Sequence, residues 1–269
     1  MNYILDPLKR NLLKILYKSV YIYKLALIII KYNNFLLPHE DDLWGLRYLR
    51  FKKKDIIDIG ASDGLCFKSI KYLGFKNNYV AFEVLKSNEE SLKKIKIKNS
   101  NFKFYMNAIG NKSSQLSIFT PVYKGVFLNN WSSYSKRQCI KNLKLRKFNL
   151  NFKKLKFKKN KIFQRKLDFF KLKPYFIKID VEGYEKNVLL GSLKTIKKHG
   201  PIICVENNSD ELYSDTIKFY IKKLNKYNYS PYIFNFRRKS FSKYEISLDN
   251  DSGTFAYNIF FLKKKHFIS

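Results

Sequence analysis

Short apolar runs alternate along the chain with longer polar, lysine-rich segments. The apolar runs lie at residues 55–59, 79–83, 102–108, 174–179 and 201–206. Several of them end in an acidic or amide side chain and are followed by a turn and a segment with helical spacing. Short buried runs separated by helical segments are typical of a parallel sheet covered by helices. The pattern therefore predicts an α/β fold.

A glycine turn follows the first apolar run. This run leads through Asp58 into Gly60-Ala-Ser-Asp-Gly64, and the second run ends in Glu83, nineteen residues after Gly64. In α/β folds such glycines let the backbone approach a nucleoside, and an acid on the next strand accepts hydrogen bonds from ribose hydroxyls. The residues that we expect to hold a nucleoside cofactor here are Asp58, Gly60, Ser62, Asp63, Gly64 and Glu83.

The composition of the turn narrows the choice of cofactor. It lacks the second glycine of the GxGxxG fingerprint, and the chain has no GxxxxGK[ST] loop, so neither a dinucleotide nor a phosphate-cradling site is indicated. Asp58 favours a ligand that carries positive charge. S-adenosylmethionine fits, because it has an ammonium, a sulfonium and a ribose diol but no phosphate. The alternative is an ordinary turn in another kind of α/β protein.

Later segments add candidate chemistry. Asn107, Ala108 and Ile109 close the run 102–108, where residues are placed to contact an adenine ring. The run 174–179 continues into an acidic turn and a helical pattern. The next run ends in Glu206 and Asn207.

In this order the segments resemble the FkbM family of S-adenosylmethionine-dependent methyltransferases. The matching motifs are DIGASDG at 58–64, AFE at 81–83, NAIGN at 107–111, KLDFF at 166–170, FIKIDVEGYEKNVLLGS at 176–192 and PIICVEN at 201–207. They cover about residues 53–210, and KIDVEGYE is the most specific of them. The resemblance implies a Rossmann-like class I methyltransferase with a seven-stranded, mostly parallel sheet of order 3-2-1-4-5-7-6 and helices on both faces. It also implies methyl transfer to a hydroxyl, often of a sugar or glycan.

The acids at the strand ends are the candidates for proton removal. Asp180 and Glu206 end neighbouring runs and could act as a base and its orienting partner, with Glu182 as a further candidate. With Asn207, the same two acids could instead bind Mg²⁺ through oxygen ligands. Glu182 and Glu185 could also simply cap a helix. Lys178 lies in the buried run, where it could touch substrate or pair with an acid.

Composition adds charge to this picture. The 269 residues include 54 basic and 21 acidic side chains, for a net charge of +33, which attracts polyanions. No acid occurs between residues 136 and 167, where apolar and basic residues alternate over 148–157. We expect an extended basic ribbon there that selects an anionic acceptor. The alternative is a solvated face exaggerated by a codon bias toward lysine.

Cysteine and histidine usage argues against other chemistry. The chain has no CxxC pair, and we expect reduced cysteines, buried at Cys66 and Cys204. Its histidines are too scattered to suggest a zinc site.

The chain is expected to divide into an N-terminal extension, residues 1–50, and a methyltransferase domain, residues 51–269, with a basic insertion at about 112–173. Lysines interrupt the apolar segment 8–32 too often for a transmembrane helix or a secretory signal. This segment is expected to form a basic amphipathic helix, which either packs on the domain or lies on an anionic membrane surface. We therefore expect a cytoplasmic protein, with membrane contact limited to such peripheral binding.

Two other functions are considered. The charge suggests an RNA methyltransferase, but the chain lacks an NPPY-type base-flipping motif and an RNA-binding module, so a nucleic-acid partner is disfavoured. A non-catalytic binding protein on the same fold is disfavoured because Asp58, Gly60, Glu83 and Asp180 are all present.

Overall fold

The computed structural model describes residues 19, 21, 22, 25, 40–145, 149–207, 211–245 and 258–268, without the side chains of 211–214. The chain divides into two compact units. The smaller comprises Met1–Leu36 and Ser117–Lys161, and the larger comprises Leu37–Leu116 and Ile162–Ser269. Apart from four isolated residues, the helix expected over 8–32 lies outside the described part of the chain.

Within that described part, no helix is long and apolar enough to cross a membrane.

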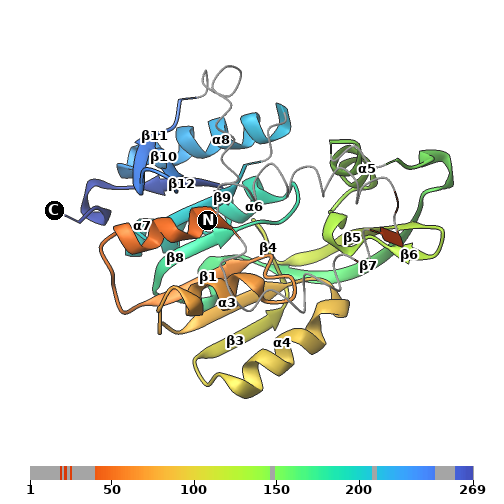
Figure 1. The fold of residues 1–269 in the computed structure, drawn as a ribbon, viewed down its shortest axis with the longest axis horizontal. Helices are drawn as coiled ribbons and strands as arrows, with labels where there is room; N and C mark the ends of the chain where they lie inside the picture. The colour runs from red at the N-terminus through yellow and green to blue at the C-terminus, as the bar shows by residue number, and fades with distance from the viewer. Residues whose placement is uncertain are drawn as a thin grey trace. The chain divides into compact units, whose positions relative to one another are not determined.

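The larger unit is built on an eight-stranded sheet of order β11-β10-β12-β9-β8-β1-β2-β3 (Figure 1). The strands are β1 (Asp55–Ile59), β2 (Tyr79–Glu83), β3 (Phe102–Met106), β8 (Pro174–Ile179), β9 (Ile202–Glu206), β10 (Ser230–Asn235), β11 (Ser240–Lys243) and β12 (Asn258–Leu262). The first five pair in parallel, whereas β12 is antiparallel to both β9 and β10, and β10 is antiparallel to β11.

The strand order agrees with the expected one apart from one additional strand. Numbered along the chain without β11, the strands stand in the order 3-2-1-4-5-7-6. The expected count of seven was wrong, because β11 adds an eighth strand beside β10. Its four residues, SFSK, are mostly exposed and offer too little apolar content to be recognised as a strand.

Helices cover both faces of this sheet, as expected. Ile56 and neighbouring inward-facing side chains pack with η1 (Asp41–Tyr48), α3 (Leu65–Tyr72) and α4 (Lys86–Lys98). The alternate side chains, such as Ile57, pack with α6 (Glu185–Leu190), α7 (Leu193–His199) and α8 (Glu211–Leu224). Successive residues of a strand point to opposite faces, so a strand buried on both sides is apolar throughout. The three cysteines are buried and form no disulfide.

A second sheet has the order β4-β7-β5-β6. Its strands are β4 (Ala108–Ile109), β5 (Ser114–Tyr123), β6 (Val126–Phe127) and β7 (Lys156–Arg165). The run 102–108 is therefore not a single strand: β3 ends at Met106, and Ala108 pairs with Gln164 of β7. The apolar character of Ala108 and Ile109 reflects burial in another sheet.

The smaller unit has its own core of Tyr123, Val126, Leu128 and Leu143. It contains η2 (Asn129–Trp131), α5 (Lys136–Leu145) and η3 (Phe152–Lys154). Residue 148, the first of the extended ribbon expected over 148–157, lies outside the described residues. The expectation was wrong at Phe152, which lies in η3, and is confirmed from Lys156, where β7 begins. The acid-free segment starts instead as a helix, α5, whose Cys139 and Leu143, four residues apart, are both fully buried.

Candidate active site

The glycine turn connects β1 to α3. Gly60 has a φ of +91° and Gly64 a φ of +87°, values that side-chain-bearing residues rarely adopt. A Cβ atom at Gly60 would collide with the carbonyl oxygen of Asp180, and one at Gly64 would collide with Ile95 of α4. Both glycines are thus required for close packing of the turn, in addition to the ligand approach inferred from the sequence.

Glu83 lies at the end of β2 and faces this turn. It is 4% exposed, and the Ser62 N–H donates to its Oε2 at 2.6 Å. The N–H groups of Val84 and Leu85 donate to its Oε1 at 2.8 and 2.7 Å. Burial raises the pKa of Glu83 to about 7, and these three N–H donors oppose the rise. The carboxylate is thereby fixed beside the turn, and lone pairs remain that could accept from a ribose diol.

Asp58 lies inside the sheet next to the turn. It is 1% exposed, and the Tyr79 hydroxyl donates to its Oδ2 at 2.7 Å. Burial raises the pKa of Asp58, while the positive charge of Lys178 opposes that shift. Asp58 thus lies deeply buried beside the turn, and its part in favouring a cationic ligand stays a prediction.

Lys178 lies in β8 beside β1 and is 3% exposed. Its Nζ donates to Asp180 Oδ2 at 2.9 Å and lies 3.2 Å from Glu40 Oε1. Burial alone would lower the pKa of Lys178, but the carboxylates of Asp180 and Glu40 raise it well above its usual value. Lys178 therefore stays charged and pairs with acids, one of the two roles that its position in the sequence suggested.

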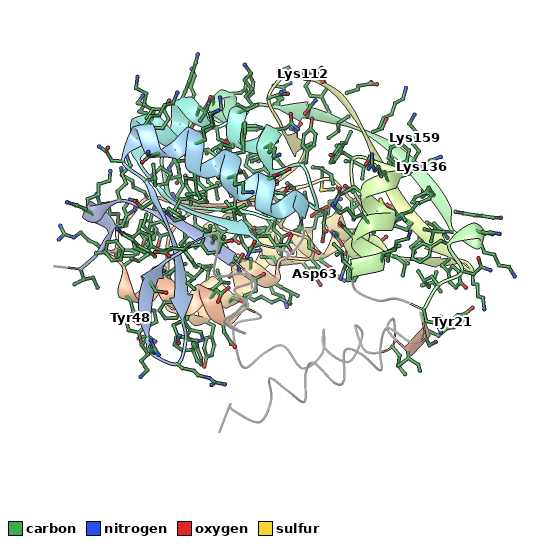
Figure 2. The ribbon with its side chains drawn as sticks, turned by 90° about the horizontal axis from the view of Figure 1, so that it is seen from above. Tyr21, Tyr48, Asp63, Lys112, Lys136 and Lys159 are labelled. Atoms are coloured by element: carbon green, nitrogen blue, oxygen red, sulfur yellow. The ribbon has the colours of Figure 1, made fainter. Side chains whose placement is uncertain are left out.

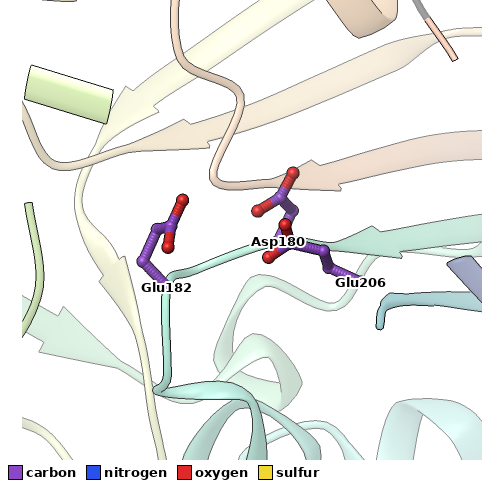
Figure 3. Close-up of side chains that lie close together, drawn as sticks. All are labelled: Asp180, Glu182 and Glu206. Carbon is purple, nitrogen blue, oxygen red and sulfur yellow. The ribbon is translucent and has the colours of Figure 1, made fainter. Parts of the chain in front are cut away.

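Three carboxylates meet at the ends of β8 and β9. Asp180, Glu182 and Glu206 each place one carboxylate oxygen within 4.8 Å of the others, and all three are half-buried (Figure 3). Burial and the charges of Asp180 and Glu182 hold the pKa of Glu206 well above its usual range. The prediction from the sequence that Asp180 and Glu206 lie close together is confirmed. These oxygens could accept a proton or bind a hard cation, and Asn207, buried next to Glu206, is the remaining candidate metal ligand.

The turn after β8 is fixed by Glu185. Its Oε1 accepts from Val181 N–H at 3.3 Å and from Gly183 N–H at 3.0 Å. Within this turn Glu182 has a left-handed φ of 53°, a costly conformation for a non-glycine residue that is often found at functional sites. Glu185 is also the acid in the first turn of α6, the position considered for compensating the helix dipole. Asp168 likewise accepts from the Thr195 N–H at 2.7 Å at the start of α7.

Of the three residues expected to contact adenine, one lies in a connection between strands and two lie in β4. Asn107, between β3 and β4, donates from Nδ2 to the Ala108 carbonyl oxygen at 2.7 Å. Ala108 and Ile109 are buried in β4. Asp63 follows Ser62 in the glycine turn and is half-buried.

The sequence did not predict that Glu40, just before η1, and Asp42, within it, bind Asn258 of β12. Glu40 accepts from Asn258 Nδ2 at 2.9 Å, and Asp42 accepts from the Asn258 backbone N–H at 3.0 Å. These contacts connect residues more than 200 positions apart, and no local pattern marks them. The sequence offers one signal that could have marked these residues: three consecutive acids, Glu40-Asp41-Asp42, in a chain rich in lysine.

Comparison with known proteins identifies one family. The family model described as the methyltransferase FkbM domain matches residues 58–231. A crystal structure of methyltransferase FkbM from Methylobacillus flagellatus KT is 16% identical, with a TM-score of 0.48, and the alignment covers 80% of this chain and 45% of that one. The precorrin-6y C5,15-methyltransferase from Geobacter metallireducens GS-15 is 10% identical, with a TM-score of 0.35 and coverage of 82% and 83%. The chain thus spans less than half of the length of the first of these structures. No curated protein matches the chain.

Proposed function

The chain belongs to the methyltransferase FkbM family, and we propose that it is an S-adenosylmethionine-dependent O-methyltransferase that acts on a hydroxyl of a sugar, a glycan or a related small molecule. The observation that carries the proposal is that a turn suited to a nucleoside and a cluster of carboxylates lie side by side. The Gly60 turn with Glu83 suits a nucleoside, and Asp180, whose carboxylate meets Glu182 and Glu206, packs its backbone against that turn.

The turn and Glu83 account for cofactor binding. The Asp180 N–H donates to the Ile59 carbonyl oxygen at 3.0 Å, so the acidic turn after β8 lies next to the glycine turn after β1. Ligands of open α/β sheets bind at the carboxyl ends of the strands, where both turns lie. A cationic cofactor is favoured there because carboxylates dominate the charge of this edge.

The carboxylates account for the chemistry. In methyl transfer the acceptor oxygen forms a bond to the methyl carbon, and the sulfur keeps the electron pair of the broken bond and becomes a neutral thioether. The hydroxyl proton must go to a base. Asp180 or Glu206 would take this proton, and the Lys178 ammonium holds the Asp180 carboxylate in place by donating to its Oδ2.

A metal ion is an alternative way of activating the acceptor. Asp180, Glu206 and Asn207 offer the oxygen donors that Mg²⁺ prefers, and the ion would lower the pKa of the acceptor hydroxyl. Loss of turnover in EDTA, restored by Mg²⁺, would support this alternative, whereas turnover unaffected by EDTA would support direct proton transfer to a carboxylate.

The experiment follows formation of S-adenosylhomocysteine from S-adenosylmethionine in the presence of a panel of mono- and oligosaccharides, with RNA as a separate arm. We expect product formation with a hydroxylated sugar, and loss of turnover by at least about 100-fold in Asp180→Asn. Lys194→Gln, on the exposed surface of α7, is the control that should remain active. Methylation of RNA alone would overturn the proposed acceptor class.

A further inference from the structure

The carboxyl edge of the large sheet is rich in acids, whereas the molecule as a whole is strongly basic. The chain has a net charge of +33. The acids Glu40, Asp58 and Asp180 nevertheless surround one buried ammonium, that of Lys178. Glu182 and Glu206 extend the same group through Asp180.

Glu40 has a particular place in this group. It reaches Lys178 at 3.2 Å from the segment before η1, and its other oxygen accepts from Asn258 Nδ2 at 2.9 Å. Its side chain is 19% exposed, so its charge is only partly screened by water. Neither its contacts nor its position suits proton transfer better than those of Asp180, which is closer to Lys178 and directly follows β8.

A buried ammonium next to the glycine turn would by itself repel a cationic cofactor. Two features of the fold put the Lys178 ammonium next to this turn. β8 pairs with β1 so that Lys178 is the register partner of Asp58, and the backbone of Asp180 packs against Gly60. The carboxylate of Glu40 offsets this ammonium and keeps the local charge negative.

We propose that Glu40 is a specificity-determining residue that, by neutralising Lys178, makes the site prefer the cationic cofactor to its neutral product. Methyl transfer converts a sulfonium into a thioether, and the two molecules otherwise share the nucleoside and amino-acid groups. A negative site therefore holds S-adenosylmethionine more tightly than S-adenosylhomocysteine and favours release of the spent product. The inference rests on the proposed function.

The test measures the dissociation constants of both molecules for the full chain by isothermal titration calorimetry. In Glu40→Gln we expect the affinity for S-adenosylmethionine to fall about tenfold, because the variant removes one of the two carboxylate partners of the Lys178 ammonium. The affinity for S-adenosylhomocysteine should change less than about twofold, since the sulfonium is the difference between the ligands. Glu90→Gln makes the same chemical change at an exposed side chain of α4 and should alter neither value.

A double variant keeps the test decisive if Glu40→Gln does not fold. Glu40→Gln combined with Lys178→Met removes one charge of each sign, so the preference for the sulfonium should return to that of the wild type. Equal losses for both ligands in Glu40→Gln, or an unchanged ratio, would overturn the inference. If the wild type binds neither molecule, the proposed function itself fails.

Discussion

At the scale of single residues, the site depends on carboxylates whose neighbours give them different properties. Glu83 is bonded to three backbone N–H groups, Asp180 to an ammonium, and Glu206 lies against other acids. The same chemical group can thus serve cofactor binding, charge balance or proton uptake according to its surroundings.

Glu83 offers the most direct test of cofactor binding. Glu83→Ala removes the acceptors proposed for the ribose hydroxyls and should weaken S-adenosylmethionine binding by about 1.5–3 kcal/mol, the usual contribution of hydrogen bonds to a charged group. Calorimetry measures the change, and a thermal melt establishes that the variant is folded. Glu89→Ala removes an acid paired with Lys93 on α4 and should bind normally. Normal binding by the Glu83 variant would refute the assignment.

Gly60 and Gly74 form a matched pair, because their φ values are +91° and +90°. A Cβ at Gly74 has no atom within 4 Å, whereas at Gly60 it would meet the Asp180 backbone. Gly74→Ala should cost about 1–2 kcal/mol of unfolding free energy from backbone conformation alone.

Gly60→Ala should cost about 1–3 kcal/mol more than that, from the forced movement of packed backbone. Urea denaturation of both variants measures the difference. Equal losses would show that the turn can open without disturbing the Asp180 backbone.

The sequence predicted the residues of the site that belong to local patterns. The strand, the glycine turn and the acid of the next strand lie close together along the chain, and so do Asp180 and Glu182. Glu40 could not be found this way, because its partners Lys178 and Asn258 are brought to it only by the order of the strands.

At the scale of elements, the buried parallel strands were the most predictable part of the fold. β1, β2, β8 and β9 are buried on both faces and largely apolar, and each is flanked by turn residues. β4 has only two residues, and three of the four residues of β11 are exposed, so these strands form only through pairing with β7 and β10, which no local pattern records.

The basic segment of the smaller unit remains a prediction as a selector of anionic acceptors. Residues 117–161 contain no acid, and Figure 2 shows the exposed Lys136 and Lys159 near each other. Both lie over the ring of Phe119, at 5.9 Å. Replacing Lys154, Lys156 and Lys158 by Glu should raise KM for an anionic acceptor roughly tenfold, from exposed ion pairs of about 0.2–1 kcal/mol each. Binding of the cofactor should be nearly unchanged.

The control for this prediction reverses three exposed lysines at Lys218, Lys222 and Lys226, which gives the same change in net charge. Steady-state kinetics at low and high salt should separate the two triple variants only at low salt. The same KM in both would indicate that the lysines reflect composition.

η7 (Lys264–His266) supplies a pH-dependent contact. His266 Nδ1 accepts from Lys263 N–H at 3.0 Å, and its Nε2 lies 2.9 Å from the Gly200 carbonyl oxygen. Burial lowers the pKa of His266 to about 4, from 6.5. Between these pH values the unfolded chain binds a proton that the folded chain does not, so the unfolding free energy falls as the pH falls.

The size of this effect follows from the change in pKa, and amounts to about 3 kcal/mol between pH 6.5 and 4. His266→Gln should be less stable at pH 7 and should lose less stability over that range. Acids with a raised pKa, such as Asp42, act in the opposite direction in both proteins, so the difference between the two denaturation series isolates His266. Parallel series for wild type and His266→Gln would contradict the assignment.

At the scale of the whole molecule, the charge distribution is uneven. Basic residues outnumber acids by 54 to 21, yet six acids (Glu40, Asp42, Asp58, Asp180, Glu182 and Glu206) belong to the one network of contacts and charge interactions around Lys178 and Asn258. We therefore expect the function of the sheet edge to depend on local charge, and the excess of lysine to act on the stability of the folded chain.

The excess charge should make the fold sensitive to salt. A net charge of +33 repels itself in the compact state, and raising NaCl from 0.02 to 0.3 M shortens the Debye length from about 20 Å to about 6 Å. The Tm should therefore rise, by roughly 2–4 °C for each kcal/mol of repulsion that is screened. Replacing Lys218, Lys222 and Lys226 by Gln lowers the net charge from +33 to +30 and should raise the Tm at low salt while reducing the gain from added salt. Differential scanning calorimetry measures both, and a Tm that stays constant or falls with NaCl would mean that the basic side chains are already compensated within the fold.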